Sequence, residues 1–277
     1  MILELLLKKV HNEREREGDI LMKKILFSLL TLFFFGFFSS LAIAGELFFE
    51  NPSVDVGNAL MVNTTIEVSL GDITLTGGAT KLMEGEFQYS SNEWKPLVSY
   101  QVKDTVGELK IEIPTNIHFS LFSFRDLSHK TLIHLNDFIP MNLFFKVGAG
   151  KSQLDLGSMT LETLTIEAGV GEVMIDLEGN TSLSRLNVKT GVGKVTIDLR
   201  GNWTQGVDSK IITGLGEVTI FLPQNIGVKV ETKRGIGAID ALNLIVNGNI
   251  FTNHLYGKTD LTLNIYLESG IGKVNLY

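Results

Sequence analysis

The chain has 277 residues, with 24 lysine and arginine residues against 31 aspartate and glutamate residues, which gives a net charge of −7. Its composition, 44% hydrophobic and 20% charged, excludes a disordered chain, and the acidic balance without a basic stripe excludes a nucleic-acid partner. The absence of cysteine excludes disulfides, thiolate metal sites and a cysteine nucleophile.

Residues 22–44 have the organisation of an export signal. A pair of lysines precedes an apolar run that ends in small residues, so we predict a cut between Ala44 and Gly45. The apolar run is also about as long as a membrane-spanning helix, so an uncleaved anchor stays an alternative. The charged residues 1–21 indicate an upstream-start extension, with Met22 as the alternative start. We therefore expect an exported protein, located in the periplasm, on the cell surface or outside the cell.

Residues 45–115 are expected to form a smaller strand-rich unit, because segments such as IEVSLGDITLT and GELKIEI alternate apolar and polar residues. Residues 116–140 are expected to be a polar connector. This connector contains three histidines and two aspartates: His118, Asp126, His129, His134 and Asp137. They are a candidate metal or catalytic set, but their spacing fits neither a helix face nor a strand face, which favours the connector.

Residues 141–277 repeat the phrase Gly-x-Gly followed by alternating apolar residues, as in GVGEVMIDL, GVGKVTIDL and GLGEVTIFL. Alternation with β-branched residues predicts strands with one buried face. The first five phrases start 21, 22, 23 and 21 residues apart, and a period of this length is typical of a solenoid. We predict an all-β fold in which a single-stranded, right-handed β-solenoid (β-helix-like) with rungs of about 22 residues follows the smaller strand-rich unit.

Each rung is expected to have two corners, where glycine accepts positive φ and lets neighbouring rungs approach closely. The first corner is marked by the glycines of the repeated phrase: Gly148, Gly150, Gly169, Gly171, Gly191, Gly193, Gly214, Gly216, Gly235, Gly237, Gly270 and Gly272. The second is marked by Gly157, Gly179, Gly201, Pro223 and Gly248. Gly270 fits the second series by spacing. Either the last rung contains an insertion near Asn247 to Tyr256, or the chain ends on the opposite corner.

The position after the second glycine alternates in charge from one rung to the next. Its residues are Lys151, Glu172, Lys194 and Glu217. Opposite charges on neighbouring strands attract, so this charge ladder would help to register the rungs. The first of these phrases, Gly150-Lys151-Ser152, resembles the end of a phosphate-binding loop. The earlier glycine that such a loop needs is replaced by Phe145, so we predict neither nucleotide binding nor any cofactor.

Asp155, Asp176 and Asp198 occupy one position in three successive rungs. Stacked carboxylates repel one another and would favour a cation such as calcium, which makes the row a weak candidate metal site. In one alternative the row serves a cation-dependent lyase or hydrolase of acidic polysaccharides. The calcium-binding Gly-Gly-x-Gly-x-Asp repeat is absent, so we expect a solvated row, with no metal and no catalytic residue.

Two tryptophans fall at predicted turns. Trp94 precedes Lys95-Pro96, and Trp203 follows Gly201-Asn202. Aromatic side chains at such places can stack on sugar rings or anchor a partner, but they more often cap the open edge of a strand layer.

The phrases LMEGEFQY, EWKPLVSYQV, HLNDFIPMNLFFKVGAGKSQLDL and GVGEVMIDL resemble the toast-rack family of bacterial envelope proteins. That family is similar to the exported part of LiaF-like cell-wall-active-antibiotic response proteins and to the putative-adhesin β-solenoids. The resemblance covers nearly all of residues 60–277 and brings no catalytic residue with it.

These observations predict an exported, non-enzymatic envelope protein that acts as a binding or assembly scaffold, in the cell-wall stress response or in adhesion. The expected partner is an envelope protein, a cell-wall polymer or a second copy of the chain. A further alternative, implied by the resemblance, is an accessory regulator of a membrane sensor kinase.

Overall fold

The computed structural model describes residues 47–114, 130–180 and 182–277. The predicted extension, export signal and cut site lie outside these residues, as do His118, Asp126 and His129. Secondary structure in the described part consists of strands and one 3-10 turn, η1 (Asn92–Trp94), as the alternation predicts. No helix in this part is long and apolar enough to cross a membrane.

The strands fall into a group of short ones in the N-terminal part and a group of long ones that follow. The short strands are β1 (Phe48–Glu50), β2 (Ser53–Val54), β3 (Met61–Leu70), β4 (Asp72–Thr76), β5 (Met83–Tyr89), β6 (Leu97–Lys103), β7 (Val106–Ile113) and β8 (Lys130–Leu135). The long strands are β9 (Met141–Asp155), β10 (Leu161–Asp176), β11 (Arg185–Asp198), β12 (Val207–Phe221), β13 (Gly227–Ala241) and β16 (Thr262–Leu276). A short hairpin of β14 (Ile245–Asn247) and β15 (Ile250–Thr252) separates β13 from β16.

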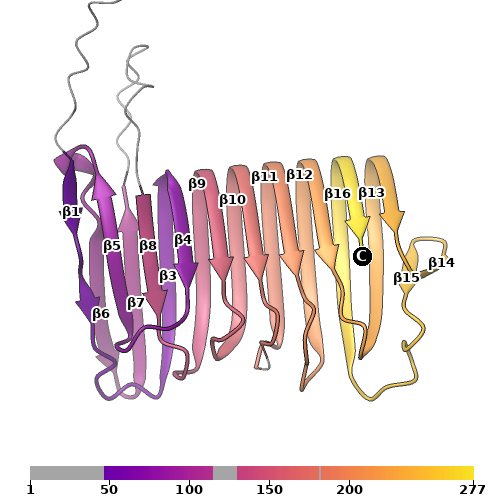
Figure 1. Ribbon diagram of the computed structural model, residues 1–277, viewed down its shortest axis with the longest axis horizontal. Helices are drawn as coiled ribbons and strands as arrows, with labels where there is room; N and C mark the ends of the chain where they lie inside the picture. The colour runs from indigo at the N-terminus through magenta and orange to yellow at the C-terminus, as the bar shows by residue number, and fades with distance from the viewer. Residues whose placement is uncertain (1–46, 115–129, 181) are drawn as a thin grey trace, which may run out of the picture. The chain divides into compact units, whose positions relative to one another are not determined.

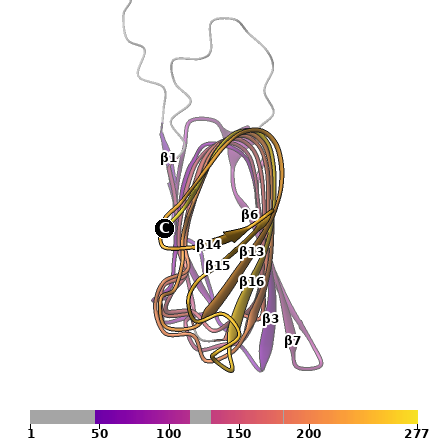
Figure 2. The ribbon, with the colours of Figure 1, turned by 90° about the vertical axis from the view of Figure 1, so that its right-hand side faces the viewer.

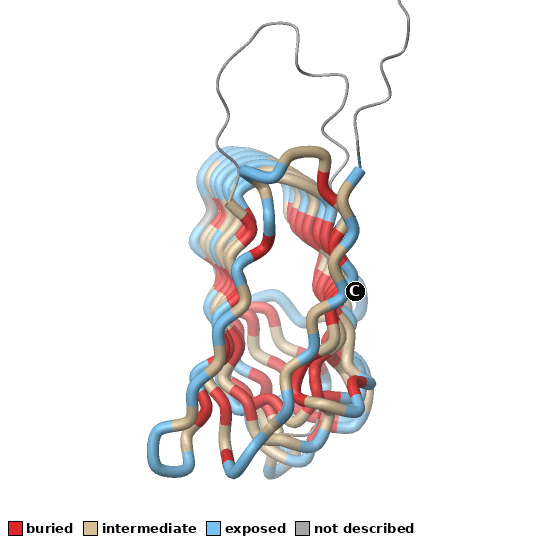
Figure 3. The backbone as a smooth tube through the Cα atoms, turned by 90° about the vertical axis from the view of Figure 1, so that its left-hand side faces the viewer, coloured by how far each residue is buried: buried red, intermediate tan, exposed pale blue. Residues whose placement is uncertain are grey.

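Every long strand bends in its middle, at the Gly-x-Gly phrase, so that it contributes one arm to each of two facing layers (Figures 1 and 3). The second glycine of each phrase has a positive φ, for example +139° at Gly171 and +137° at Gly193. A Cβ atom on Gly193 would collide with the carbonyl oxygen of Gly171 in the next strand. Only glycine satisfies both the backbone angle and the close stacking of the bends.

The long strands pair in parallel and in register, in the order β9-β10-β11-β12-β16-β13. Bend stacks on bend, since Gly171 pairs with Gly150 on one side and with Gly193 on the other. The alternate apolar residues of both arms point between the layers and are buried, for example Val173, Ile175 and Val195. The all-β prediction is confirmed, whereas the handedness of the winding and the rung length of about 22 residues stay predictions.

The last long strand does not lie at the end of the row. β16 is inserted between β12 and β13, with Gly272 paired to Gly216 and to Gly237. The β14–β15 hairpin occupies the segment where an insertion was one of two alternatives, and the bend at Gly270 joins the first corner series. β13 is therefore the outermost long strand, although β16 follows it in the chain.

The N-terminal part continues the same sheet, and here the structure differs from the expected domain boundaries. β3 and β4 both pair in parallel with β9, and a bend at Gly71 (φ +130°) stacks on Gly150. β8, which lies inside the expected connector 116–140, is a paired strand next to β4. The described residues belong to one compact unit, so the expected unit 45–115 is joined to the repeats by continuous strand pairing.

Antiparallel strands close this end of the row. β7 stacks in parallel on β3, and β6 then runs antiparallel along β7. On the other layer β5 runs antiparallel along β8, and β1 and β2 along β5. Because a parallel stack presents unpaired backbone at its last strand, these antiparallel strands act as a cap.

Candidate functional site

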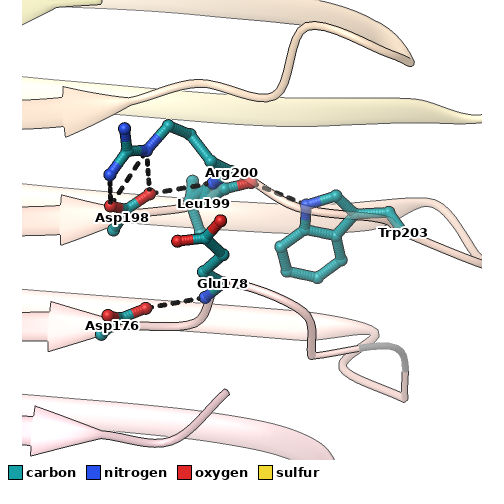
Figure 4. Close-up of polar contacts among 6 residues, drawn as sticks. All are labelled: Asp176, Glu178, Asp198, Leu199, Arg200 and Trp203. Carbon is teal, nitrogen blue, oxygen red and sulfur yellow. Dashed lines mark hydrogen bonds and ion pairs between the residues drawn. The ribbon is translucent and has the colours of Figure 1, made fainter.

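The aspartate row lies where the second arms end (Figure 4). Asp155 pairs with Asp176, and Asp176 with Asp198, as the repeat predicts. Figure 4 shows the last two of these three aspartates. The Asp176 carboxylate accepts the Glu178 backbone N–H (2.9 Å), and that of Asp198 accepts the Arg200 N–H (3.0 Å). Two carboxylates of the row therefore close the turns that follow their own strands, as aspartate commonly does two residues before a turn N–H.

Asp198 is in addition ion-paired with Arg200, whose Nε lies 2.9 Å from its Oδ1. Partial burial raises the pKa of the Asp198 carboxyl, but the hydrogen bonds and charge of Arg200 outweigh it, so the pKa lies below its usual range. The Arg200 guanidinium also lies 5.0 Å from the ring centre of Phe221, the residue beside Asp198 on the next strand. The row thus ends on an aromatic ring rather than on a fourth carboxylate.

Three of the other candidate polar side chains, His134, Asp137 and Lys151, have structural partners. Nδ1 of His134 lies 2.8 Å from the Thr76 hydroxyl, and the Asp137 carboxylate accepts the Ser158 hydroxyl (2.8 Å). In the Gly-Lys-Ser phrase, Lys151 pairs with Glu172 (3.6 Å) and Ser152 faces the core. Within the described ranges, no three His, Cys, Asp or Glu side chains are grouped so that they could hold a metal ion.

The two tryptophans pack on the protein. Trp203 is buried, and its indole N–H donates to the Leu199 carbonyl (2.7 Å), so it closes the turn between β11 and β12 (Figure 4). Trp94 packs against the hydrophobic core and is partly buried. Trp203 therefore fills a turn between two inner strands of the row and does not cap an open edge of the sheet.

A hollow of about 340 Å³ lies just past the ends of β12, β13 and β16. It is lined by Leu222, Pro223, Gln224, Leu242, Asn243, Leu244, Asn253, His254 and Tyr277. His254 and Tyr277 are its ionisable side chains, and it contains no Asp, Glu, Lys or Arg that could serve as a second acid–base group or as an anion clamp.

A row of exposed aliphatic side chains runs along the bends, and the sequence analysis did not single it out. The first of the six phrases has the small Ala149 in its middle, beside Val170. The middle residues of the other five point outward between their glycines, and in register they form what we call the corner ridge: Val170, Val192, Leu215, Ile271 and Ile236. Each is between 45% and 74% exposed. With strands about 4.8 Å apart, the ridge is about 19 Å long.

Charged side chains line both sides of the corner ridge. After the bends, the predicted ladder of Lys151, Glu172, Lys194 and Glu217 is continued by Lys273 of the inserted strand. Before the bends, a second alternating row runs through Glu67, Lys146, Glu167 and Lys189, is interrupted at Ile212, and resumes at Glu268 and Lys233. Ion pairs such as Lys233–Glu268 (3.0 Å) and Lys273–Asp240 (2.8 Å) neutralise many of these charges within the chain.

The corner ridge therefore has an apolar centre and a charged rim without a dominant sign. A protein interface is commonly arranged in this way. A signal for the ridge was present in the sequence, because the middle residues read Val, Val, Leu, Ile and Ile. Period-two alternation could not assign them to a face, since the bend interrupts the alternation.

Comparison with known proteins identifies the family. The model of the N-terminal domain of toast_rack, DUF2154, matches residues 45–184 and 179–221, which together span more than half of the chain. The chain belongs to the toast-rack family. No curated protein is significantly similar to it.

Matches to solved structures cover most of the chain. A putative cell adhesion protein from Clostridium sporogenes is 34% identical, with a TM-score of 0.64, and the match covers 83% of this toast-rack chain and 99% of that protein. A putative adhesin from Bacteroides fragilis is 13% identical, with a TM-score of 0.32, and the match covers 84% of this chain and 97% of that one.

Proposed function

We propose that this toast-rack protein is an exported, non-enzymatic scaffold that binds a protein of the cell envelope through the corner ridge. The observation that carries the proposal is the ridge itself: five aliphatic side chains in register, each at least 45% exposed, between two rows of alternating charges. Exposed apolar patches with polar rims are typical of protein interaction sites. The likeness to a cell adhesion protein supports a binding role of this kind.

A protein is the preferred partner, because the ridge consists of valine, leucine and isoleucine. Sugar rings are usually bound by aromatic stacking, and Trp203 is buried in a turn. The polysaccharide lyase alternative is not favoured, since Asp176 and Asp198 are engaged in closing turns. We further propose that the bent parallel strands form the right-handed β-solenoid predicted from the repeat, with the ridge as one of its corners.

The test uses the full chain, recovered after export, and measures its binding to envelope fractions. We expect saturable binding that is lost when the envelope is treated with protease. Val192→Asp places a charge in the ridge and should abolish binding, because the carboxylate would have to be desolvated at the interface. Thr196→Asp, four residues further along β11 and outside the ridge, is the matched control and should bind like the wild type.

Thermal unfolding of both variants checks that they are folded. Absence of binding by the wild type, or equal binding by Val192→Asp and the wild type, would overturn the proposal. Binding that survives protease treatment but is lost on digestion of the cell-wall polymer would reassign the partner and contradict the preference for a protein.

A further inference from the structure

One arm of the outermost long strand has a free backbone edge. On its inner side β13 pairs with β16 along its whole length, and on its outer side β15 pairs with Lys229–Glu231 of the first arm. No strand in the described ranges pairs with the outer side of the second arm, residues 236–241. Figure 2 looks onto this end of the row, where β14 and β15 lie beside the lower part of β13.

The backbone groups on this edge can be assigned. The Leu242 N–H donates to the Leu276 carbonyl of β16 (2.8 Å), so the backbone N–H of Leu242 points toward β16. Because N–H and C=O groups alternate sides along a strand, those of Ile239 and Ala241 point to the outer side. These are the groups that a further strand would bind.

The side chains near this edge lack the features that usually prevent pairing. Ile236 is 74% exposed and Leu242 is 58% exposed, and they bracket the free arm. In the whole segment GIGAIDALNLIV, residues 235–246, Asp240 is the single charged residue, and there is no proline. Natural edge strands are commonly blunted by lysine, proline or bulges, so an edge of this composition is suited to pairing.

The chain itself closes comparable edges with antiparallel strands. β6 covers β7 and β5 covers β8 at the N-terminal end, and β15 covers the first arm of β13. The second arm of β13 has no such cover among the described residues. We propose that a second copy of the chain supplies it, by antiparallel pairing of the two β13 second arms about a two-fold axis at Ile239.

This register follows from the assignment of the backbone groups. A residue whose N–H and C=O point to the outer side must face a residue of the same kind in the second copy. Centring the pair on Ile239 brings Leu242 of the second copy to the bend that carries Ile236, so exposed apolar side chains lie at both ends of the paired segment. It also sets Ala238 opposite Asp240 of the second copy, so no carboxylate faces its own counterpart. The segment is thus complementary to itself, as an isologous two-fold interface requires.

The experiment is sedimentation equilibrium of the full exported chain over a range of concentrations, with the expected result of a monomer–dimer equilibrium. Ala238→Glu places like charges opposite Asp240 twice in each dimer and should raise the dimer Kd about tenfold or more. Inside the chain the new glutamate would lie beside Lys273 and extend the charge ladder, so thermal unfolding should be unchanged. Gln153→Glu, which adds a carboxylate on the exposed face of β9, is the matched control and should dimerise like the wild type.

A second variant tests the backbone directly. Ala241→Pro removes an N–H that points to the outer side and leaves the bonds to β16 in place, a position where edge strands tolerate proline. It should also weaken the dimer. A chain that stays monomeric, a chain that forms open-ended assemblies, or variants that both keep the wild-type Kd would overturn the proposal. Ile236 belongs to both surfaces, but Val192→Asp changes β11 and leaves β13 as it is. This variant should lose envelope binding and keep the wild-type dimer Kd, so the two proposals fail separately.

Discussion

Each long strand has a bend in its middle and is followed by a turn at its end, and the bend and the turn are stabilised in different ways. At the corner ridge the bends stack backbone on backbone, and every long strand carries the same Gly-x-Gly phrase. At the opposite end the turns are closed by side chains of more than one kind: the turn after β10 uses the buried amide of Asn180, and the turn after β11 uses Trp203. Backbone stacking demands one residue type at each bend, whereas side-chain closure permits variation from turn to turn.

The sharpest test of this comparison exchanges glycine for alanine at both ends. Gly193→Ala should lower the free energy of unfolding by roughly 3 kcal/mol or more, because its Cβ would collide with the Gly171 carbonyl and its φ is +137°. Gly179→Ala, in the turn after β10, should cost about 1 kcal/mol, since its φ is +82° and a Cβ there meets no atom within 4 Å. Urea unfolding measures both. Equal losses would mean that the bend does not depend on close stacking.

Removal of the Asn180 amide tests side-chain closure. Its Nδ2 donates to the Leu156 (3.1 Å) and Met159 (2.9 Å) carbonyls, and its Oδ1 accepts the Leu183 N–H (3.1 Å). The two carbonyls keep the Met159 and Leu161 N–H groups as donors, whereas the buried Leu183 N–H loses its acceptor. Asn180→Ala removes three buried hydrogen bonds in all and should cost about 2 kcal/mol in urea unfolding. Asn202→Ala, at an exposed site in the next turn, should cost less than about 0.5 kcal/mol. If Asn180→Ala lowered the free energy of unfolding no more than Asn202→Ala, the proposed role of the Asn180 amide would be wrong.

The Asp198–Arg200 pair should have the smallest effect, and its effect should depend on pH. The pKa of Asp198 is lowered in the folded chain, so its stabilisation is present above the unfolded pKa and is lost as pH falls through the folded one. Asp198→Asn should cost about 0.5 kcal/mol near neutral pH, because the pair is partly exposed. The difference from the wild type should shrink below about pH 4. Asp155→Asn, on the exposed end of the row, is the control; a pH-independent difference at Asp198 would contradict this account.

The aspartate row shows which features the spacing of the repeats can predict and which it cannot. Spacing predicted that Asp155, Asp176 and Asp198 pair with one another across strands, and they do. It could not predict what each carboxylate binds, because that depends on the turn that follows: Glu178 N–H for Asp176, and both the N–H and the guanidinium of Arg200 for Asp198. The corner ridge was missed for a related reason, since the outward direction of Val192 or Leu215 is decided by the bend.

The order of the strands along the chain does not predict the position of β16 in the sheet. The phrase at Gly270 could be assigned to either corner, because identical phrases can pair with any neighbour that carries the same phrase. In space, Lys273 lies between Glu217 and Ala238 and continues the alternation of charge. If β13 followed β12 directly, Ala238 would stand beside Glu217 and the ladder would stop there.

The amino-acid sequence by itself determined the strands, their buried faces and the charge alternation, because these depend on period-two patterning and on local backbone preferences. The tertiary structure alone decided which strand lies beside which. β3 and β4 pair with β9, β16 lies between β12 and β13, and antiparallel strands cap the N-terminal end. The reason is that pairing partners are chosen by contacts between residues far apart in the chain, and a repeated phrase offers several equivalent partners.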